Sequence, residues 1–308
     1  MARVDGIVKL RKLTGLPFKL CKEAFDKYGG SISESLTYLE RCGQEFEPLT
    51  KSLNNGVIFS YNSNNTFGLF SVKCTTDFAA RSQTIYDISA KIGHTLCNEH
   101  SKQIGAKWMT GRIYHHQNEG VKAMHDEVHR LLKMASLTLK EQTHLSDSFI
   151  IHNPSPNDSV KNDGNRPKRF TGVYVHGSHG FKALDRGKLG TGGAIIGLDC
   201  QFKGLGGLTV KAFQRIADEI AVHLYSIKNL SKDMVKDAFQ LPIIRVDEFS
   251  KLYLQIAGES GCSANDITGS DEVNLGGFIR SLSDLGFVVR LNGAGLLDLS
   301  GAVYIALR

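Results

Sequence analysis

The chain has 308 residues, and its 37 Lys and Arg against 31 Asp and Glu give a net charge of +6. A content of 41% apolar and 22% charged residues excludes a disordered or fibrous chain. The length suits one large domain or a few small ones. No run of about eighteen apolar residues occurs, so we expect no membrane-spanning helix and no membrane partner.

The cysteines and the N-terminus bear on the cellular compartment. The six cysteines form no C-x-x-C pair, which favours free thiols in a reducing environment. Residues 1–6 contain no apolar signal core. We therefore expect a cytoplasmic protein, or a protein of an organelle matrix if it is imported and trimmed.

The excess positive charge is modest and is not gathered into a stripe. Its tightest cluster, Arg166 to Arg169, lies in a stretch rich in Pro, Asn, Asp and Ser, which is typical of a solvated loop. Direct binding of nucleic acid is therefore not expected, although the charge permits an acidic partner.

The N-terminal residues have the pattern of three short helices. Apolar residues recur there at helical spacing, and Gly15 and Gly30 stand where the first two helices would end. Ser31 with Glu34 fits a capping box at the start of the third helix. A unit of about forty residues buries little apolar area by itself. We therefore expect residues 1–45 to form a docking module and not a catalytic domain.

A hairpin followed by a helix is predicted next. Val57, Phe59 and Tyr61 recur at the period of a strand, residues 62–65 supply a polar turn, and residues 68–74 return as a second strand. The helix that follows carries an apolar inner stripe formed by Ile85, Ile88, Ile92 and Leu96.

This hairpin-plus-helix unit recurs in the second half of the chain. Residues 171–176 and 194–200 form the second predicted hairpin, and the helix after it has an apolar stripe from Phe213 to Leu224. In the return strands, Leu69, Val72 and Cys74 align with Ile195, Leu198 and Cys200. Strand-then-helix patterns are common, so the pattern alone leaves a chance likeness open.

The sequence thus predicts an α+β fold, with an N-terminal three-helix module followed by a core of two hairpin-plus-helix subdomains. The subdomains are expected at residues 55–150 and 170–308, the second with a divergent insertion at 229–275, where Pro242 and several glycines interrupt the helical signals. The remaining predicted elements are helices over 121–139, 234–239, 249–256 and 275–285, and strands over 287–291 and 302–306.

The motifs of common catalytic sites are missing from the sequence. Gly187-Lys188 lacks the spacing and the hydroxyl residue of a phosphate-binding loop, and no Gly-x-Ser-x-Gly elbow occurs. His125 and His129 lie at helical spacing without further ligands at zinc spacing, so we interpret them as structural or solvent-facing. We expect a binding protein and not an enzyme, with no cofactor and no metal. A catalytic cluster that converges only in the fold is left open.

Two stretches share the motifs of one known family. The first comprises residues 10–15, 21–24 and 30–43, and the second comprises residues 72–81 with Thr76-Asp77-Phe78 at its centre. The first resembles the N-terminal module of elongation factor Ts, a three-helix domain of the ubiquitin-associated type. The second resembles the Thr-Asp-Phe signature of the same family.

The resemblance implies that the chain acts in translation elongation as a guanine-nucleotide exchange factor for a partner GTPase, elongation factor Tu. In the family an Asp-Phe pair enters the partner near its magnesium and nucleotide site, a role that falls here to Asp77 and Phe78. An exposed ring can wedge between packed elements, and a carboxylate can compete for the donors that order the ion. The partner-contacting positions implied by the resemblance are Arg11, Thr76, Asp77, Phe78, Arg81, His176, Ile196, Gly197 and His223.

Other interpretations of these residues are open from sequence. Asp77 and Phe78 alone also fit an ordinary helix start with Phe78 in the core. Arg11, His176 and His223 also fit ordinary helix and strand positions, and Ile196-Gly197 fits a plain strand.

The chain also departs from the family pattern. The long helical hairpin of the family has no clear counterpart in residues 229–275, and segments 153–169 and 178–193 are unusual insertions. The alternative function is a non-exchanging scaffold or binding subunit of the same fold, such as one within an RNA-handling complex. The sequence is also compatible with a homo-oligomer.

Overall fold

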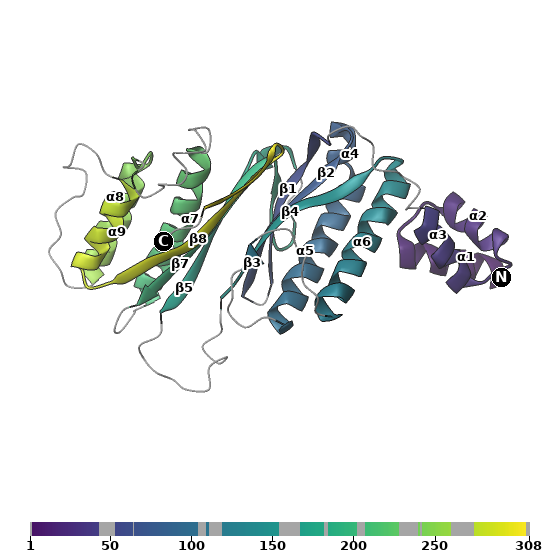
Figure 1. The fold of residues 1–308 in the computed structure, drawn as a ribbon, viewed down its shortest axis with the longest axis horizontal. Helices are drawn as coiled ribbons and strands as arrows, with labels where there is room; N and C mark the ends of the chain where they lie inside the picture. The colour runs from purple at the N-terminus through teal and green to yellow at the C-terminus, as the bar shows by residue number, and fades with distance from the viewer. Residues whose placement is uncertain are drawn as a thin grey trace.

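The protein is built from two antiparallel sheets that face each other, with helices on their outer sides and three further helices at one end (Figure 1). This confirms the predicted α+β class. The structure, a computed structural model, describes residues 2–42, 53–63, 65–103, 109–110, 119–153, 167–181, 184–201, 207–227, 240, 242–259 and 274–305. No helix among these residues combines the length and the apolar character that crossing a membrane requires.

The first sheet has the strand order β3-β4-β2-β1-β6. Its strands are β1 (Asn55–Ser63), β2 (Thr66–Cys74), β3 (Met109–Thr110), β4 (Thr143–His152) and β6 (Leu189–Gly190). Helices α5 (Gln83–Gln103) and α6 (Glu119–Leu139) cover its outer face (Figure 1). The apolar stripe predicted for α5 is buried against β1 and β2, because alternate residues of these strands point to the same side.

The second sheet has the strand order β5-β7-β8-β9. Its strands are β5 (Lys168–His176), β7 (Gly192–Gln201), β8 (Val288–Asp298) and β9 (Gly301–Ile305). The helices on its outer side are α7 (Gly207–Ser226), α8 (Val246–Glu259) and α9 (Leu275–Asp284). Three phenylalanines that are fully buried in this layer, Phe213, Phe249 and Phe278, come from these three helices.

The two sheets share a plan that the sequence alignment of their return strands anticipates. In each sheet the hairpin strands pair, and the return strand pairs on its other side with a later strand, β4 or β8. A β-bulge interrupts this second pairing between Ser71 and Val72 in β2 and between Gly197 and Leu198 in β7, at aligned positions. The division into two subdomains with the stated boundaries stays a prediction.

A shared core joins the sheets face to face. Its buried members are Ile58, Leu69, Phe149, Ile151, Val175, Ile195 and Leu297. The aligned residues Leu69 and Ile195 both point into this layer, while Cys74 and Cys200 point to the helices outside their own sheets. Burial of apolar surface stabilises a fold by about 25 cal/mol per Å². This contact therefore holds the two sheets in place relative to each other.

The N-terminal helices are α1 (Ala2–Thr14), α2 (Phe18–Lys27) and α3 (Ile32–Cys42), which confirms the three predicted helices. The Ser31 hydroxyl accepts a hydrogen bond from the Glu34 N–H at 3.4 Å, but the Ser31 N–H donates to the Tyr28 carbonyl. Only half of the predicted capping box is therefore present. Met134 of α6 is buried in the core of these helices, so they are docked onto the first sheet's helical layer.

Several elements differ from the sequence-based prediction. No strand was predicted at the position of β4, which follows the predicted helix over 121–139, and β8 extends beyond the predicted strand. The predicted helices over 121–139, 249–256 and 275–285 are present as α6, α8 and α9, and β9 matches the last predicted strand. Outside the described residues lie residues 43–52, residues 154–166 of the first insertion, residues 182–183 of the second, and much of the divergent insertion at 229–275 with the predicted helix at 234–239.

Candidate functional site

A one-turn helix, α4 (Asp77–Ala80), projects from the end of strand β2 (Figure 1). Its last two residues, Ala79 and Ala80, are each 5% exposed and pack into the core under the first sheet. Asp77 is exposed, and the ring of Phe78 is 84% exposed. The alternative in which Phe78 fills the core is therefore excluded. An exposed aromatic ring offers a partner a large apolar area to bury.

The start of α4 is fixed by hydrogen bonds from three directions. The Thr76 hydroxyl accepts from the Ala79 N–H at 3.2 Å, which caps the helix. Glu141, in the turn between α6 and β4, accepts from the Thr76 hydroxyl at 2.8 Å and from the Thr76 N–H at 3.1 Å. Asn55 of β1 donates to the Thr75 carbonyl at 2.7 Å. These bonds hold the helix start against both the sheet and the helical layer.

The thiol of Cys74 adds a further support beneath the turn. It lies 3.2 Å from the Thr76 carbonyl oxygen and donates to it. Burial, together with the nearby Glu141 carboxylate, raises the pKa of this thiol to about 11. The thiol is therefore protonated near neutral pH, which makes it a hydrogen-bond donor and not a nucleophile.

The end of α4 is closed by Arg81. Its N–H donates to the Asp77 carbonyl at 3.1 Å, and its exposed guanidinium lies 5.6 Å from the centre of the Phe181 ring. Within the described part of the chain, the Asp77 carboxylate accepts no hydrogen bond. The arrangement presents one acid and one ring outward on a short, well-anchored turn.

Two further predicted site residues, Arg11 and His176, are exposed and belong to other elements than α4. Arg11 is on α1, in the N-terminal helices at the far end from the second sheet (Figure 1). His176 ends strand β5; its ring stacks on Tyr225 with 5.2 Å between centroids, and its Nδ1 lies 3.1 Å from the Tyr174 hydroxyl. The fold thus brings Thr76 to Arg81 together and keeps Arg11 apart from them.

Comparison with known proteins gives one consistent result, although no protein-family model matches the chain. A protein named elongation factor Ts, mitochondrial 2, of Paramecium tetraurelia is 30% identical over 95 residues, 30% of this chain and 32% of that protein. Elongation factor Ts of Ehrlichia canis is 23% identical over 258 residues, 80% of this chain and 77% of that protein. The chloroplastic elongation factor Ts of Cyanidium caldarium is 37% identical over 84 residues, 26% of this chain and 40% of that protein.

The chain is a divergent member of the elongation factor Ts family. The similarity to the Paramecium protein spans only about a third of that protein's length, whereas the similarity to the Ehrlichia protein spans most of both chains.

Three predicted contact residues of this elongation factor Ts homologue are buried, which corrects their assignment to a contact surface. Ile196 is 0% exposed in the core between β7 and α7, and His223 on α7 is 1% exposed. Gly197 is buried in β7 between Thr171 of β5 and Gly293 of β8. The side chains of Ile196 and His223 therefore lie in the interior of the second sheet and its helical layer, and Gly197 is enclosed by its two neighbouring strands.

The imidazole of His223 is held neutral by its surroundings. Burial lowers its pKa to about 4 from the usual 6.5. Its Nδ1 accepts from the Ile244 N–H at 3.4 Å, and its buried Nε2 has no hydrogen-bond partner among the described residues. Protonation would therefore place an uncompensated charge inside the core.

We expect His223 to make the protein less stable in acid. The folded pKa lies below the unfolded one, so the unfolded chain binds the proton first and stability falls as pH drops from about 6.5 to about 4. Between pH 7 and pH 5 this costs about 2 kcal/mol. Urea unfolding at both pH values should show this loss in the wild type and not in His223→Leu. A variant at an exposed residue that does not titrate, Leu254→Ala, should keep the wild-type pH dependence. An equal loss of stability in the wild type and in His223→Leu would contradict the prediction.

Sequence reasoning missed Glu141 and Asn55, which bond the start of α4, and Phe181, whose ring lies next to the Arg81 guanidinium. Glu141 precedes β4, a strand that the sequence pattern did not indicate, and Phe181 lies in a segment interpreted only as an insertion. No local pattern marks these residues, because their role depends on elements that lie far apart in the sequence. A polar residue such as Asn55 at a strand start is too common to serve as a signal.

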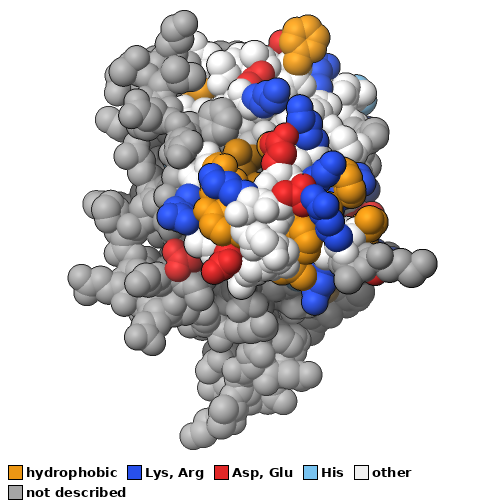
Figure 2. Space-filling model, turned by 90° about the vertical axis from the view of Figure 1, so that its right-hand side faces the viewer, with side chains coloured by type: hydrophobic (Ala, Val, Ile, Leu, Met, Phe, Trp, Pro, Cys, Tyr) orange, Lys and Arg blue, Asp and Glu red, His pale blue; other side chains and the backbone are white. Residues whose placement is uncertain are grey.

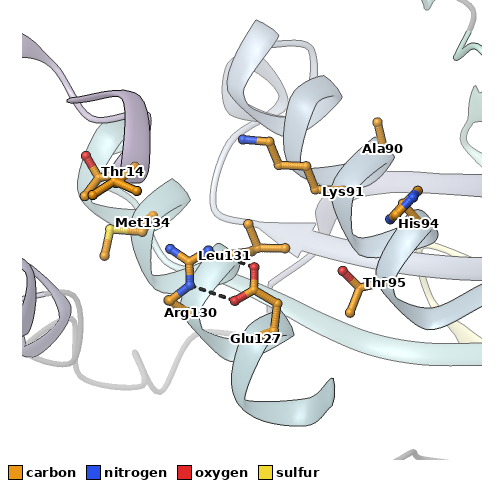
Figure 3. A pocket seen from close by; sticks show the side chains of 10 residues that line it. Thr14, Ala90, Lys91, His94, Thr95, Glu127, Arg130, Leu131 and Met134 are labelled. Carbon is orange, nitrogen blue, oxygen red and sulfur yellow. Dashed lines mark hydrogen bonds and ion pairs between the residues drawn. The ribbon is translucent and has the colours of Figure 1, made fainter. Parts of the chain in front are cut away.

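The N-terminal helices present a mixed surface next to a hollow. Figure 2 shows Lys and Arg, Asp and Glu, and hydrophobic side chains interspersed on this end of the molecule. The exposed apolar residues of α1 and α2 are Val4, Val8, Leu13 and Phe18. A pocket of about 410 Å³ is lined by Leu13 of α1 and by residues of α5 and α6. Lys91, His94 and the Arg130–Glu127 ion pair lie on its wall (Figure 3). Among the described residues, no group of His, Cys, Asp or Glu side chains could hold a metal ion.

Proposed function

We propose that this elongation factor Ts homologue is a guanine-nucleotide exchange factor that promotes GDP release from elongation factor Tu during translation elongation. The observation that supports the proposal most strongly is the 84% exposure of Phe78 on a helix whose start is anchored by Glu141 and Asn55. A large apolar ring in water has an unfavourable hydration free energy, which burial in a partner would remove.

The proposed mechanism is displacement and not covalent chemistry. Mg²⁺ and backbone amides hold GDP in a GTPase, so release requires that this arrangement be disturbed. Phe78 wedges between packed elements of the partner, and the unpaired Asp77 carboxylate competes for the donors and waters that order the ion. Because the factor binds the nucleotide-free partner more tightly, linkage requires that it weaken nucleotide binding. The protein is then not an enzyme and uses no cofactor.

The rest of the proposed contact surface follows from exposure. Thr76 caps the start of α4, and Arg81 is exposed at its end. His176 is exposed on β5, and Arg11 is exposed on α1 of the N-terminal helices. We propose that these helices form a ubiquitin-associated-like module that docks on elongation factor Tu through their exposed apolar residues. The protein then works in the cytoplasm or in an organelle matrix, where translation takes place.

The proposal is tested by the release of fluorescent GDP from elongation factor Tu of the same organism, followed by stopped flow with an excess of unlabelled GDP. We expect the full chain to accelerate release by at least about tenfold and to lower the affinity for GDP, within the ~5- to 150-fold range of ordinary coupling between sites. Binding to elongation factor Tu without acceleration would reject exchange in favour of the scaffold. Bovine serum albumin at the same concentration serves as the protein control.

A further inference from the structure

A segment between β5 and β7 of the second sheet crosses to the first sheet. This segment, called the strap here, comprises residues 177–181 and 184–190 and contains β6. Strand β6 pairs with β1 through Gly190 opposite Ile58 and Leu189 opposite Phe59. Leu184 and Leu189 are buried in the core under the first sheet. The strap connects β5 and β7 of the second sheet, but its strand β6 forms the edge of the first sheet.

Hydrogen bonds fix the strap along β1. The Ser60 N–H donates to the Lys188 carbonyl at 2.9 Å, and the Asn62 N–H donates to the Arg186 carbonyl at 2.8 Å. A Cβ atom at Gly187 would lie 1.9 Å from the Ser60 carbonyl oxygen, so the backbones are as close as glycine allows. Paired backbone groups and this close approach fix residues 186–190 of the strap rigidly on β1.

The strap reaches α4 through Phe181. The ring of Phe181 packs on the core under the first sheet, and the Arg81 guanidinium lies 5.6 Å from its centroid. A Cβ atom at the neighbouring Gly180 would lie 3.4 Å from Arg81 Nη1, so the strap backbone runs directly beside the guanidinium. A guanidinium within about 6 Å of a ring centroid is attracted by the ring.

Arg81 is the residue that closes α4. Its N–H donates to the carbonyl of Asp77, and the Ala80 N–H donates to that of Thr76 at 3.2 Å. A helix of one turn has almost no stability of its own, because nucleation is unfavourable and few hydrogen bonds follow. A force that holds the Arg81 side chain therefore also holds the turn that presents Asp77 and Phe78.

The geometry points to Phe181 as a positioning residue for the Asp77–Phe78 tip, acting through Arg81. The strap of the second sheet thereby orders the tip that the first sheet carries. This inference rests on the proposed exchange function for its consequence, but the ordering of α4 itself is a property of the isolated chain.

The first experiment compares Phe181→Leu with Phe181→Tyr. Leucine keeps apolar contact with the core but removes the ring face, whereas tyrosine keeps both. For Phe181→Leu we expect the maximal rate of GDP release at saturating factor to fall about two- to fivefold, with an unchanged half-saturating concentration. Phe181→Tyr should retain the wild-type rate. In the Arg81→Gln background, Phe181→Leu should have no further effect; an equal additional loss there would overturn the proposal.

The second experiment measures hydrogen exchange of the free protein by NMR or mass spectrometry. We expect the Ala80 and Arg81 amides to exchange about two- to fivefold faster in Phe181→Leu, with the amide of Phe59 in β1 unchanged. Unchanged exchange at α4, or an equal increase at Phe59, would overturn the positioning role. If the wild type does not accelerate GDP release, the proposed function fails, while hydrogen exchange still decides the inference about Phe181.

Discussion

Replacing Phe78 with alanine is expected to slow factor-stimulated GDP release from elongation factor Tu by about 30-fold, which corresponds to about 2 kcal/mol. The ring is 84% exposed in the free protein, so its removal leaves no cavity and should change the free energy of unfolding by less than about 0.5 kcal/mol. The whole effect should therefore appear in exchange and none in folding. Stopped-flow release of fluorescent GDP and thermal unfolding measure the two quantities.

A matched control comes from α8, on the outer side of the second sheet. Leu254 is 40% exposed there, so Leu254→Ala removes exposed apolar area far from α4. This variant should exchange nucleotide as fast as the wild type. If Phe78→Ala is as active as the wild type, or if Leu254→Ala loses as much activity, the tip is not the exchange element.

Replacing Gly172 with alanine is expected to destabilise the protein by about 3 kcal/mol or more. A Cβ atom at Gly172 of β5 would lie 1.9 Å from the Ala217 carbonyl oxygen and 2.2 Å from its carbonyl carbon in α7. These are backbone atoms, which cannot rotate away as a side chain can. Helix and strand would have to separate, and the apolar contacts between them would be lost. Chemical unfolding followed by circular dichroism measures the change.

Gly258 provides the control for this substitution. It lies in α8, and a Cβ atom there meets nothing within 4 Å. Because alanine favours helix over glycine by up to about 1 kcal/mol, Gly258→Ala should leave stability equal or slightly higher. A Gly172→Ala variant as stable as Gly258→Ala would show that α7 and β5 do not pack this closely.

Elements formed by contacts between residues close in sequence were predicted well. The helices α2 and α3 follow from the spacing of residues such as Cys21, Ala24 and Leu39, which are buried in their shared core. The first hairpin follows from alternation in β1 and a polar turn. In both cases the pattern that identifies the element is also the pattern that its neighbours bury.

The strands that sequence analysis missed depend on distant partners. In β4, Ser146 is the extra residue of a bulge opposite Ser71 and Val72 of β2, so the alternation of apolar and polar residues that marks a strand is broken. In β8, Gly295 is a strand residue because the Phe149 ring of the facing sheet occupies the space a side chain would fill; a Cβ atom would lie 2.4 Å from that ring. From sequence alone, a glycine at this position is typical of a turn.

The sequence by itself determined the α+β class, the three N-terminal helices and the presence of an acid and a ring after a capping threonine. Only the tertiary structure decided that Phe78 faces water while Ile196 and His223 face the core. Exposure is decided by the layers that cover a residue, and these come from segments far away in the chain. Local residue type and spacing fix which side chains are available, but packing between the two sheets and their helices fixes which of them can reach a partner.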